Sequence, residues 1–305
     1  MKTIIPSLIK WSGSKRLQAN KLISLIPNHE RYFEPFLGGG SLMYLIKSNH
    51  IFASDIYKPL IDLWLVVKNE HKYLIDDYQK RWEELQIELK EIRANEKIYL
   101  KKSRQNFPKT FYSARSEFNK SKNPLAFNFI LRTCVNGIVR FNSKGEFNNS
   151  FHLSRNGMNP AIFKKVVEKW SLKLKSVDIN CADYTYVLDN AISGDFIYLD
   201  PPYLGCNNRY VKPINANEFF DFLDVLNRKR VYWMCSLDGF SNNKNYENYS
   251  LPRELYKKSI LIKNGRSFTS GVLNNKEGEV FESLYTNYQT PIIDKLTQLD
   301  LKIAS

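Results

Sequence analysis

The sequence predicts an α/β fold organised around a doubly wound sheet. Short apolar runs alternate with helical segments near both ends of the chain, a pattern typical of such sheets. One run, at residues 31–33, leads into a glycine-rich turn, and another, at 195–199, ends in an aspartate and two prolines. Open α/β sheets bind ligands at the carboxyl ends of their strands, so these turns are expected to line one site.

The first part of the sheet is expected near the amino terminus. A helix is predicted at 17–25 and a short strand at 31–33. After the glycine-rich turn, a helix at 42–47 and a strand at 51–54, which ends at Asp55, complete the unit. The same alternation returns near the other end of the chain, with strands at 195–199, 231–235 and 280–287 and a helix at 216–226.

The middle of the chain interrupts this alternation. Residues 70–104 are charged and helical in period, and we expect them to pack one face on the core. Their apolar stripe consists of Leu74, Tyr78, Trp82, Leu85 and Leu89.

Shorter helices, at 111–118 and 124–134, precede a β-hairpin predicted at 136–148, with its turn at 143–145. The sequence therefore predicts an inserted domain at 66–165. The sheet-containing domain would consist of residues 1–65 and 166–305.

Composition limits the class of protein. At 305 residues and 43% hydrophobic content, the chain is long enough to bury a large core. Its formal net charge of +14 favours a polyanionic partner, although a solubility role or a membrane surface would also fit. No apolar stretch approaches a bilayer span, and Pro6 lies where a signal sequence would have its core, so we expect a cytoplasmic protein without a membrane partner.

Cysteine and histidine show no metal-binding pattern. The four cysteines form no CxxC pair, and the four histidines lie far apart in sequence. We therefore predict no metal site and expect the cysteines to be buried free thiols.

The segment Asp200-Pro201-Pro202-Tyr203 carries the strongest chemical signal. The two prolines fix φ and prevent further strand pairing, so the acid and the aromatic ring are held at a strand's carboxyl end. A carboxylate and backbone carbonyls accept both hydrogens of an exocyclic amine, while a tyrosine ring stacks on a planar base. The pattern suits an adenine rotated out of a duplex, although a rigid exit turn would also explain the prolines.

The glycine-rich turn is the second chemical signal. Three glycines at 38–40, between a strand and a helix, allow a ligand to approach the backbone and the N–H groups of the helix terminus. Asp55 is placed to accept ribose hydroxyls, unless it caps a helix that starts near Tyr57. Upstream, Trp11 would stack on a base, unless it is a core residue.

The chain resembles the Dam-type, α-group DNA adenine-N6 methyltransferases in five segments that follow the family's order. They are KWSGSK (10–15), EPFLGGGS (34–41), SDIYKPLIDLW (54–64), RTCVNGIVRFNSKGEFN (132–148) and DPPY (200–203). The resemblance implies a Rossmann-like class I methyltransferase sheet with an inserted, mainly helical plus β-hairpin target-recognition domain. It also implies methyl transfer from S-adenosylmethionine to adenine N6 in double-stranded DNA, by base flipping.

The resemblance assigns residues to the cofactor and to the reaction. Hydrogen bonds from adenine N6 to the Asp200 carboxylate and the Pro201 carbonyl would localise the nitrogen lone pair for direct transfer, with Tyr203 stacked on the base. The implied catalytic residues are Asp200, Pro201, Pro202 and Tyr203. The implied cofactor-binding residues are Trp11, Lys15, Pro35, Phe36, Gly38, Gly40, Ser41, Asp55, Ile56, Asp183 and Asp200.

DNA recognition is expected in the insertion. Arg140, Asn142 and Lys144 on the predicted hairpin would reach a major groove and its phosphates. By resemblance, Arg115 and Arg132 match phosphate-contacting arginines.

The resemblance also places Lys10 and Arg140 at base-contacting positions and Asn136 in the loop that fills the space left by the flipped base. Many relatives that read GATC have an aromatic residue where Val135 stands, so GATC is not assigned as the target.

Two other functions are kept as alternatives. One is methyl transfer to cytosine N4 or to an RNA base, against which the leading aspartate of DPPY and the hairpin argue. The other is a catalytically silent DNA-binding module. For the favoured function, a monomer that acts alone or beside a cognate restriction endonuclease is expected.

Overall fold

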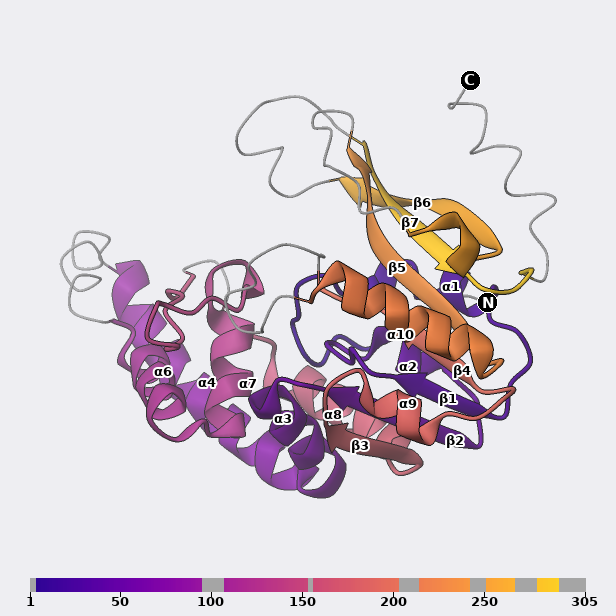
Figure 1. Ribbon diagram of the computed structural model, residues 1–305. Helices are drawn as coiled ribbons and strands as arrows, with labels where there is room; N and C mark the ends of the chain where they lie inside the picture. Colours follow the sequence, from indigo (N-terminus) through magenta and orange to yellow (C-terminus); the bar gives the residue numbers. More distant parts are fainter. Residues whose placement is uncertain are drawn as a thin grey trace.

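The computed structural model describes residues 4–94, 107–152, 156–202, 214–241, 251–266 and 279–290. In these ranges the chain forms a seven-stranded sheet with helices on both faces, and further helices pack beside it (Figure 1). The predicted α/β fold is confirmed.

The sheet contains β1 (Arg31–Glu34), β2 (His50–Asp55), β3 (Val177–Cys181), β4 (Phe196–Leu199), β5 (Tyr232–Ser241), β6 (Lys258–Arg266) and β7 (Glu279–Thr286). Their order is β3-β2-β1-β4-β5-β7-β6. The first five are parallel, whereas β7 is antiparallel to β5 and β6. The order reverses between β1 and β4, where open α/β sheets bind ligands beyond the carboxyl ends of the strands.

Alternate residues of the central strands pack into two separate cores. Tyr32, Phe196 and Tyr198 face one core, which also holds side chains of α1 (Ala19–Ile23), α2 (Ser41–Leu45), α3 (Lys58–Asn69) and α8 (Pro160–Leu174). Phe33, Ile197 and Leu199 face the other, under α9 (Tyr186–Asn190) and α10 (Ala216–Arg228). These strands are therefore apolar on both faces, as buried parallel strands are.

The helices that start with proline are capped by asparagine. Asn123 accepts a hydrogen bond from Leu125 N–H at the start of α7 (Pro124–Thr133), and Asn159 accepts one from Ala161 N–H at the start of α8. In both helices proline occupies the first turn, where no N–H donor is needed. These local signals fix where the two helices begin.

The predicted middle region is mainly helical. The apolar stripe at 74–89 lies in α4 (His71–Ala94) and faces inward, while residues 95–104 of the predicted helix lie outside the described residues. Tyr78 of this stripe stacks on Phe163 of α8, with ring centroids 3.9 Å apart. Figure 1 shows α4, α6 (Lys109–Ser121) and α7 beside the sheet, beyond α3 and α8.

The predicted domain boundaries fall inside helices. Residue 66 lies in α3 and residue 165 in α8, and both helices share one core with the sheet and with α4, α6 and α7. The structure therefore does not separate two domains at these boundaries, and the division into a catalytic and a recognition region remains a proposal about function.

The predicted hairpin is confirmed. Phe141 and Phe147 form an antiparallel bridge, and Asn142 N–H donates to the carbonyl oxygen of Glu146 at 2.9 Å. Gly145 closes the turn with a φ of +73°, a conformation that glycine adopts at little cost.

A buried ion pair joins the amino ends of β1 and β4. Arg31 donates from Nε to Asp195 Oδ1 at 2.9 Å and from Nη2 to Oδ2 at 2.5 Å. Oδ2 also accepts a hydrogen bond from Ile192 N–H at 2.7 Å. The Asp195 side chain is 3% exposed and that of Arg31 25%, so water screens this pair only in part.

We expect Asp195→Asn to lower the free energy of unfolding by about 1–3 kcal/mol, because it removes the charge of a buried, hydrogen-bonded carboxylate. Urea unfolding measures the change. Asp224→Asn is the matched control, because Asp224 pairs with Arg228 on the surface at 3.1 Å, where ion pairs contribute little. Equal losses in the two variants would contradict the expectation.

Candidate active site

Segments that follow three neighbouring strands meet at one edge of the sheet. The glycine-rich turn follows β1, Asp55 ends β2 and Asp200 follows β4. Residues 10–15, from the amino-terminal segment, lie across this edge and contact the turn and Asp200. The structure therefore brings together the sequence signals that predicted a single site.

Trp11 lies directly on the glycine-rich turn. Gly38 has a φ of +47°, and a Cβ atom there would lie 2.9 Å from Cδ1 of Trp11, closer than real Cβ contacts. Gly40 has a φ of +62°, and a Cβ there would lie 3.0 Å from Cε of Met43. Both positions therefore require glycine, for backbone conformation and for space.

Asp55 holds the glycine-rich turn in place. Its carboxylate accepts hydrogen bonds from Gly38 N–H at 3.1 Å and from Tyr57 N–H at 3.0 Å. The helix α3 begins at Lys58, and Tyr57 is its N-cap residue, so Asp55 precedes the helix and does not cap it. Burial raises the pKa of Asp55 to about 6, although the backbone hydrogen bonds oppose the shift.

Asp200 is paired with a lysine from the amino-terminal segment. Lys15 Nζ donates to Asp200 Oδ1 at 2.6 Å and also contacts Oε1 of Glu282, in β7, at 2.9 Å. Burial raises the pKa of Asp200, and Lys15 opposes that shift. Burial disfavours the Lys15 ammonium, but the two carboxylates outweigh it and raise the pKa of Lys15.

A second buried carboxyl lies beside this ion pair. Glu34, at the end of β1, is 3% exposed, and Oε2 accepts a hydrogen bond from the Tyr32 hydroxyl at 2.6 Å. Burial raises the pKa of Glu34 to about 8, against the Tyr32 hydrogen bond, and the Asp200 charge adds to the increase. Glu34 is therefore mostly protonated at neutral pH.

Sequence reasoning missed the roles of Glu34 and Glu282. Glu34 lies within the EPFLGGGS segment, but the sequence alone does not show that its side chain is buried. Glu282 lies two residues before Leu284 in the same strand, so both side chains are on the face that packs on the core. An acidic residue on that inward face was the sequence signal that could have marked Glu282 as a site residue.

The remaining predicted cofactor residues lie along the same edge. Phe36 stacks on Tyr184, with centroids 5.5 Å apart, and the Ser41 hydroxyl lies 2.8 Å from that of Ser14. Pro35 is buried, whereas Ile56 is 46% exposed. Asp183 is exposed beyond β3 and accepts hydrogen bonds from the Thr185 N–H and hydroxyl at 3.0 and 2.8 Å.

The prolines of the DPPY segment follow Asp200 directly. Pro201 is buried and Pro202 is partly exposed. Tyr203, the predicted stacking residue, lies outside the described residues.

Tyr57 connects this site to the hairpin. Its ring centroid lies 6.2 Å from that of Trp11, 5.9 Å from that of Phe141 and 6.0 Å from that of Phe127 in α7. The base of the hairpin therefore packs next to the residue that covers the glycine-rich turn.

Lys10 and Asn136, both predicted to act on DNA, lie at one loop. Asn136 and Gly137 have φ values of +56° and +62°, and Asn136 is exposed. A Cβ atom on Gly137 would lie 3.3 Å from Cβ and Cδ of Lys10, so the lysine stem packs on this glycine. Consecutive residues, Lys10 and Trp11, thus contact the predicted DNA-binding loop and the glycine-rich turn.

The hairpin presents two exposed cations. Lys144 is exposed at the turn, and exposed Arg140 donates to Asn148 Oδ1 at 2.9 Å. Asn142 is occupied by the turn itself, because its Oδ1 accepts hydrogen bonds from Lys144 and Glu146 N–H at 3.0 and 2.9 Å. Arg115 is partly buried, stacks on Tyr112 and donates to Asn149 O at 3.2 Å.

Arg132 departs from the expectation of a phosphate contact. Its side chain lies inside the protein, with the residue 3% exposed, and Nη2 donates to Ser7 O at 3.0 Å. Its guanidinium carbon lies 5.1 Å from the Phe163 ring centroid, and burial lowers its pKa to about 10. Because α7 is buried along nearly its whole length, this arginine lies inside the protein, where it joins the amino-terminal segment to the helical core and is not placed to meet DNA.

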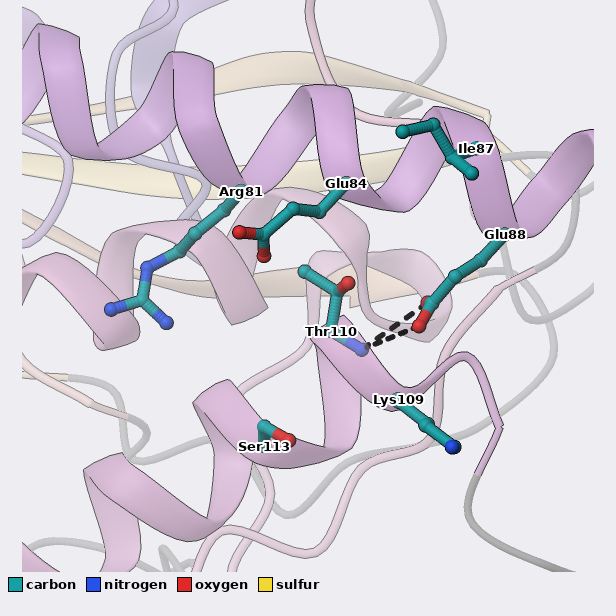
Figure 2. A pocket seen from close by; sticks show the side chains of 7 residues that line it. All are labelled: Arg81, Glu84, Ile87, Glu88, Lys109, Thr110 and Ser113. Atoms are coloured by element: carbon teal, nitrogen blue, oxygen red, sulfur yellow. Dashed lines mark hydrogen bonds between the residues drawn. The ribbon is translucent and has the colours of Figure 1, made fainter.

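A surface groove lies elsewhere, between α4 and α6. It has a volume of about 400 Å³ and is lined by Arg81, Glu84, Ile87, Glu88, Lys109, Thr110 and Ser113 (Figure 2). Glu88 accepts the Thr110 N–H at 3.2 Å across it, which satisfies a donor in the first turn of α6. No predicted site residue lines this groove, so it is separate from the candidate active site.

The cysteines are not all buried. Cys134 and Cys235 are buried free thiols, as expected, whereas Cys181 is exposed at the end of β3. Cys206 lies outside the described residues.

In the described ranges, no three or more His, Cys, Asp or Glu residues are arranged to hold a metal ion. None of the helices described there is long and apolar enough to cross a membrane.

Comparison with known proteins gives concordant matches. The family described as D12 class N6 adenine-specific DNA methyltransferase matches residues 11–269. The chain is 28% identical to the type II methyltransferase M.MjaIII of Methanocaldococcus jannaschii, over 93% of this chain and 99% of that protein. It is 26% identical to the type II methyltransferase M1.LlaDCHI of Lactococcus lactis subsp. cremoris, over 92% of this chain and 94% of that protein. A DNA adenine methylase of Escherichia coli K12 is 26% identical to this chain, over 65% of this chain and 64% of that protein.

The buried Glu34 carboxyl predicts a pH dependence of stability. Between its ordinary pKa and about 8, the native protein keeps a proton that the unfolded chain loses, so stability falls as pH rises through this range. We expect Glu34→Gln, which resembles the protonated form, to reduce this loss by up to about 1.4 kcal/mol per pH unit. Urea unfolding between pH 6.5 and 9 measures the slopes; this range lies above the pKa of about 6 of Asp55. An equal change in the free energy of unfolding with pH in the variant and in the native sequence would contradict the expectation.

Proposed function

Because this chain belongs to the D12 class family of N6 adenine-specific DNA methyltransferases, we propose that the edge formed by the glycine-rich turn, Asp55 and Asp200 is its active site. The observation that carries the proposal is the ion pair between Lys15 and Asp200 at the switch point of the sheet, beside the glycine-rich turn.

The residues at this edge fit S-adenosylmethionine, which supplies an electrophilic methyl group on a sulfonium. The turn has no space for a Cβ at Gly38, and its backbone is held by Asp55. The partly exposed rings of Trp11 and Phe36 offer apolar surface. The proposed binding residues are Trp11, Lys15, Pro35, Phe36, Gly38, Gly40, Ser41, Asp55, Ile56, Asp183 and Asp200.

Asp200 is suited to hold an exocyclic amine. Its Oδ1 is fixed by Lys15, whereas among the described residues nothing donates a hydrogen bond to Oδ2. In the proposed reaction Oδ2 and the Pro201 carbonyl accept the N6 hydrogens, which localises the lone pair on the nitrogen. The bond from N6 to the methyl group would then form as the methyl–sulfur bond of the sulfonium breaks, without a covalent enzyme intermediate. The thioether S-adenosylhomocysteine would leave, and the proton lost from N6 would pass by way of Asp200 to water. Positioning would supply much of the acceleration. Tyr203 would stack on the flipped base.

The proposed DNA surface runs from Lys10 and Asn136 to the hairpin. These two residues lie beside the site, and Arg140 and Lys144 extend from it with exposed cations. Arg115 and Asn142 lie on the same part of the fold, although both side chains already make local hydrogen bonds. Double-stranded DNA would be held mainly through phosphates and read through base edges.

We also propose the biological context. The two type II methyltransferases match over more than nine-tenths of this chain, whereas the DNA adenine methylase matches 65%, which favours a role beside a cognate restriction endonuclease over a solitary role. The enzyme would act on cellular DNA in the cytoplasm as a monomer. The family assignment favours adenine N6 over cytosine N4 or an RNA base, and a silent DNA-binding module is tested below.

We expect Asp200→Ala to abolish N6-methyladenine formation, with a loss of at least about 100-fold, because it removes the acceptor that holds the amine. DNA binding should stay within about twofold, since that side chain is not on the proposed phosphate surface. Transfer of radiolabelled methyl groups to duplex DNA and gel-shift titration measure the two quantities. Retained turnover in the variant would refute the assignment, and an inactive native protein would favour a silent module.

We expect Arg140→Ala to relax sequence selectivity by about 1–3 kcal/mol, because an arginine in the major groove discriminates bases by bidentate hydrogen bonds. Methylation rates on a panel of duplexes, with the native target found by modified-base sequencing, measure the change. Arg228→Ala is the matched control, because Arg228 is exposed at the end of α10, away from the hairpin. Unchanged selectivity in Arg140→Ala would place recognition elsewhere.

A further inference from the structure

Lys15 uses all three of its hydrogen-bond donors. An ammonium group has three N–H bonds, and Nζ lies 2.6 Å from Asp200 Oδ1, 2.9 Å from Glu282 Oε1 and 3.2 Å from Gly13 O. Glu282 comes from the antiparallel strand β7, which is neighbour to β5 and not to β4. One ammonium therefore joins the amino-terminal segment, the end of β4 and β7.

This arrangement is costly for stability alone. The side chains of Lys15 and Glu282 are each 11% exposed, and two carboxylates share one cation. Burial raises the pKa of Glu282, Lys15 lowers it, and the Asp200 charge raises it further. Because well-packed apolar residues often replace buried ion pairs without loss of stability, the network calls for a functional explanation.

The geometry shows what Glu282 does to the pair. Lys15 contacts only Oδ1 of Asp200, while its second carboxylate contact points to β7. Without that second contact, only the hydrogen bond to Gly13 O would oppose a shift of the ammonium toward the centre of the Asp200 carboxylate, where it would engage both oxygens. Glu282 thus keeps the contact one-sided.

We propose that Glu282 is a positioning residue for methyl transfer: it holds the Lys15 ammonium on Oδ1 of Asp200 and so leaves Oδ2 directed to the amine of the target base. Glu282 does not touch the substrate and acts through Lys15. This inference rests on the proposed role of Asp200.

Glu282→Gln is the principal test. The amide keeps the side chain's size but loses the charge that competes with Asp200 for Lys15. We expect kcat for N6-methyladenine formation to fall about tenfold or more, while KM for DNA and for S-adenosylmethionine stays within about twofold. Glu282→Asp keeps the charge but withdraws the carboxylate by one methylene, and we expect a smaller fall in kcat, also without a change in KM.

Asp195→Asn is the matched control. It removes a buried carboxylate from the same sheet, at the amino end of β4, where no predicted site residue lies. It should lower Tm but leave kcat within about twofold. Because kcat is compared at matched folded fractions, a general loss of stability does not imitate the expected result.

The outcomes separate the hypotheses. A kcat within twofold of native in Glu282→Gln, or a fall in kcat that Asp195→Asn shares, would overturn the role of Glu282. If Glu282→Gln does not fold, the kcat of Glu282→Asp decides in the same way. An inactive native enzyme would refute the proposed function and this inference with it, whereas active native protein with fully active variants would count against Glu282 alone.

Discussion

The ion pair between Lys15 and Asp200 is the contact on which the rest of the site depends. It spans 185 positions in sequence and fixes the amino-terminal segment at the end of β4. The Asp200 side chain is 24% exposed, so water would only partly stabilise its charge if the cation were removed. Trp11, in the same segment as Lys15, packs on Gly38, so the ion pair and this packing together hold the segment against the sheet edge.

The glycine-rich turn and the base of the hairpin meet next to the end of β2. Asp55 holds the glycine-rich turn, and Tyr57, two residues later, contacts Trp11 and the base of the hairpin. On the other side of the hairpin base, Lys10 packs on Gly137. The short spacing from Asp55 to Tyr57 and from Lys10 to Trp11 therefore keeps the glycine-rich turn and the hairpin base in a fixed relation, even though the hairpin lies far along the chain from both.

Much of this architecture was predictable, because local signals mark it. Proline, glycine and aspartate at strand ends located the edge of the candidate site. Short apolar runs located β1, β2, β4, β5 and β7, and a helical pattern located α4, whereas no strand bounds were predicted at β3 or β6. Nonlocal features were not predictable. Of the helix expected at 17–25, only Ala19–Ile23 (α1) is α-helical; it follows a 3-10 turn (Lys15–Leu17) in which Lys15 contacts Asp200 and Glu282. Arg132 was expected at the surface, and only the packing of α7 against the amino-terminal segment shows that it is buried. The pairing of Glu282 with Lys15 likewise depends on the strand order.

The hairpin has a buried base and an exposed tip. Phe141 and Phe147 at its base are buried, whereas Ser143, Lys144 and Gly145 at its tip are exposed, as is Arg140, which hydrogen-bonds to Asn148. Substitutions at the tip therefore leave the packing of the base intact. In the proposed function, changes at the tip would alter the contacts with DNA without disturbing the sheet edge, which is the property wanted when such an enzyme is retargeted by design.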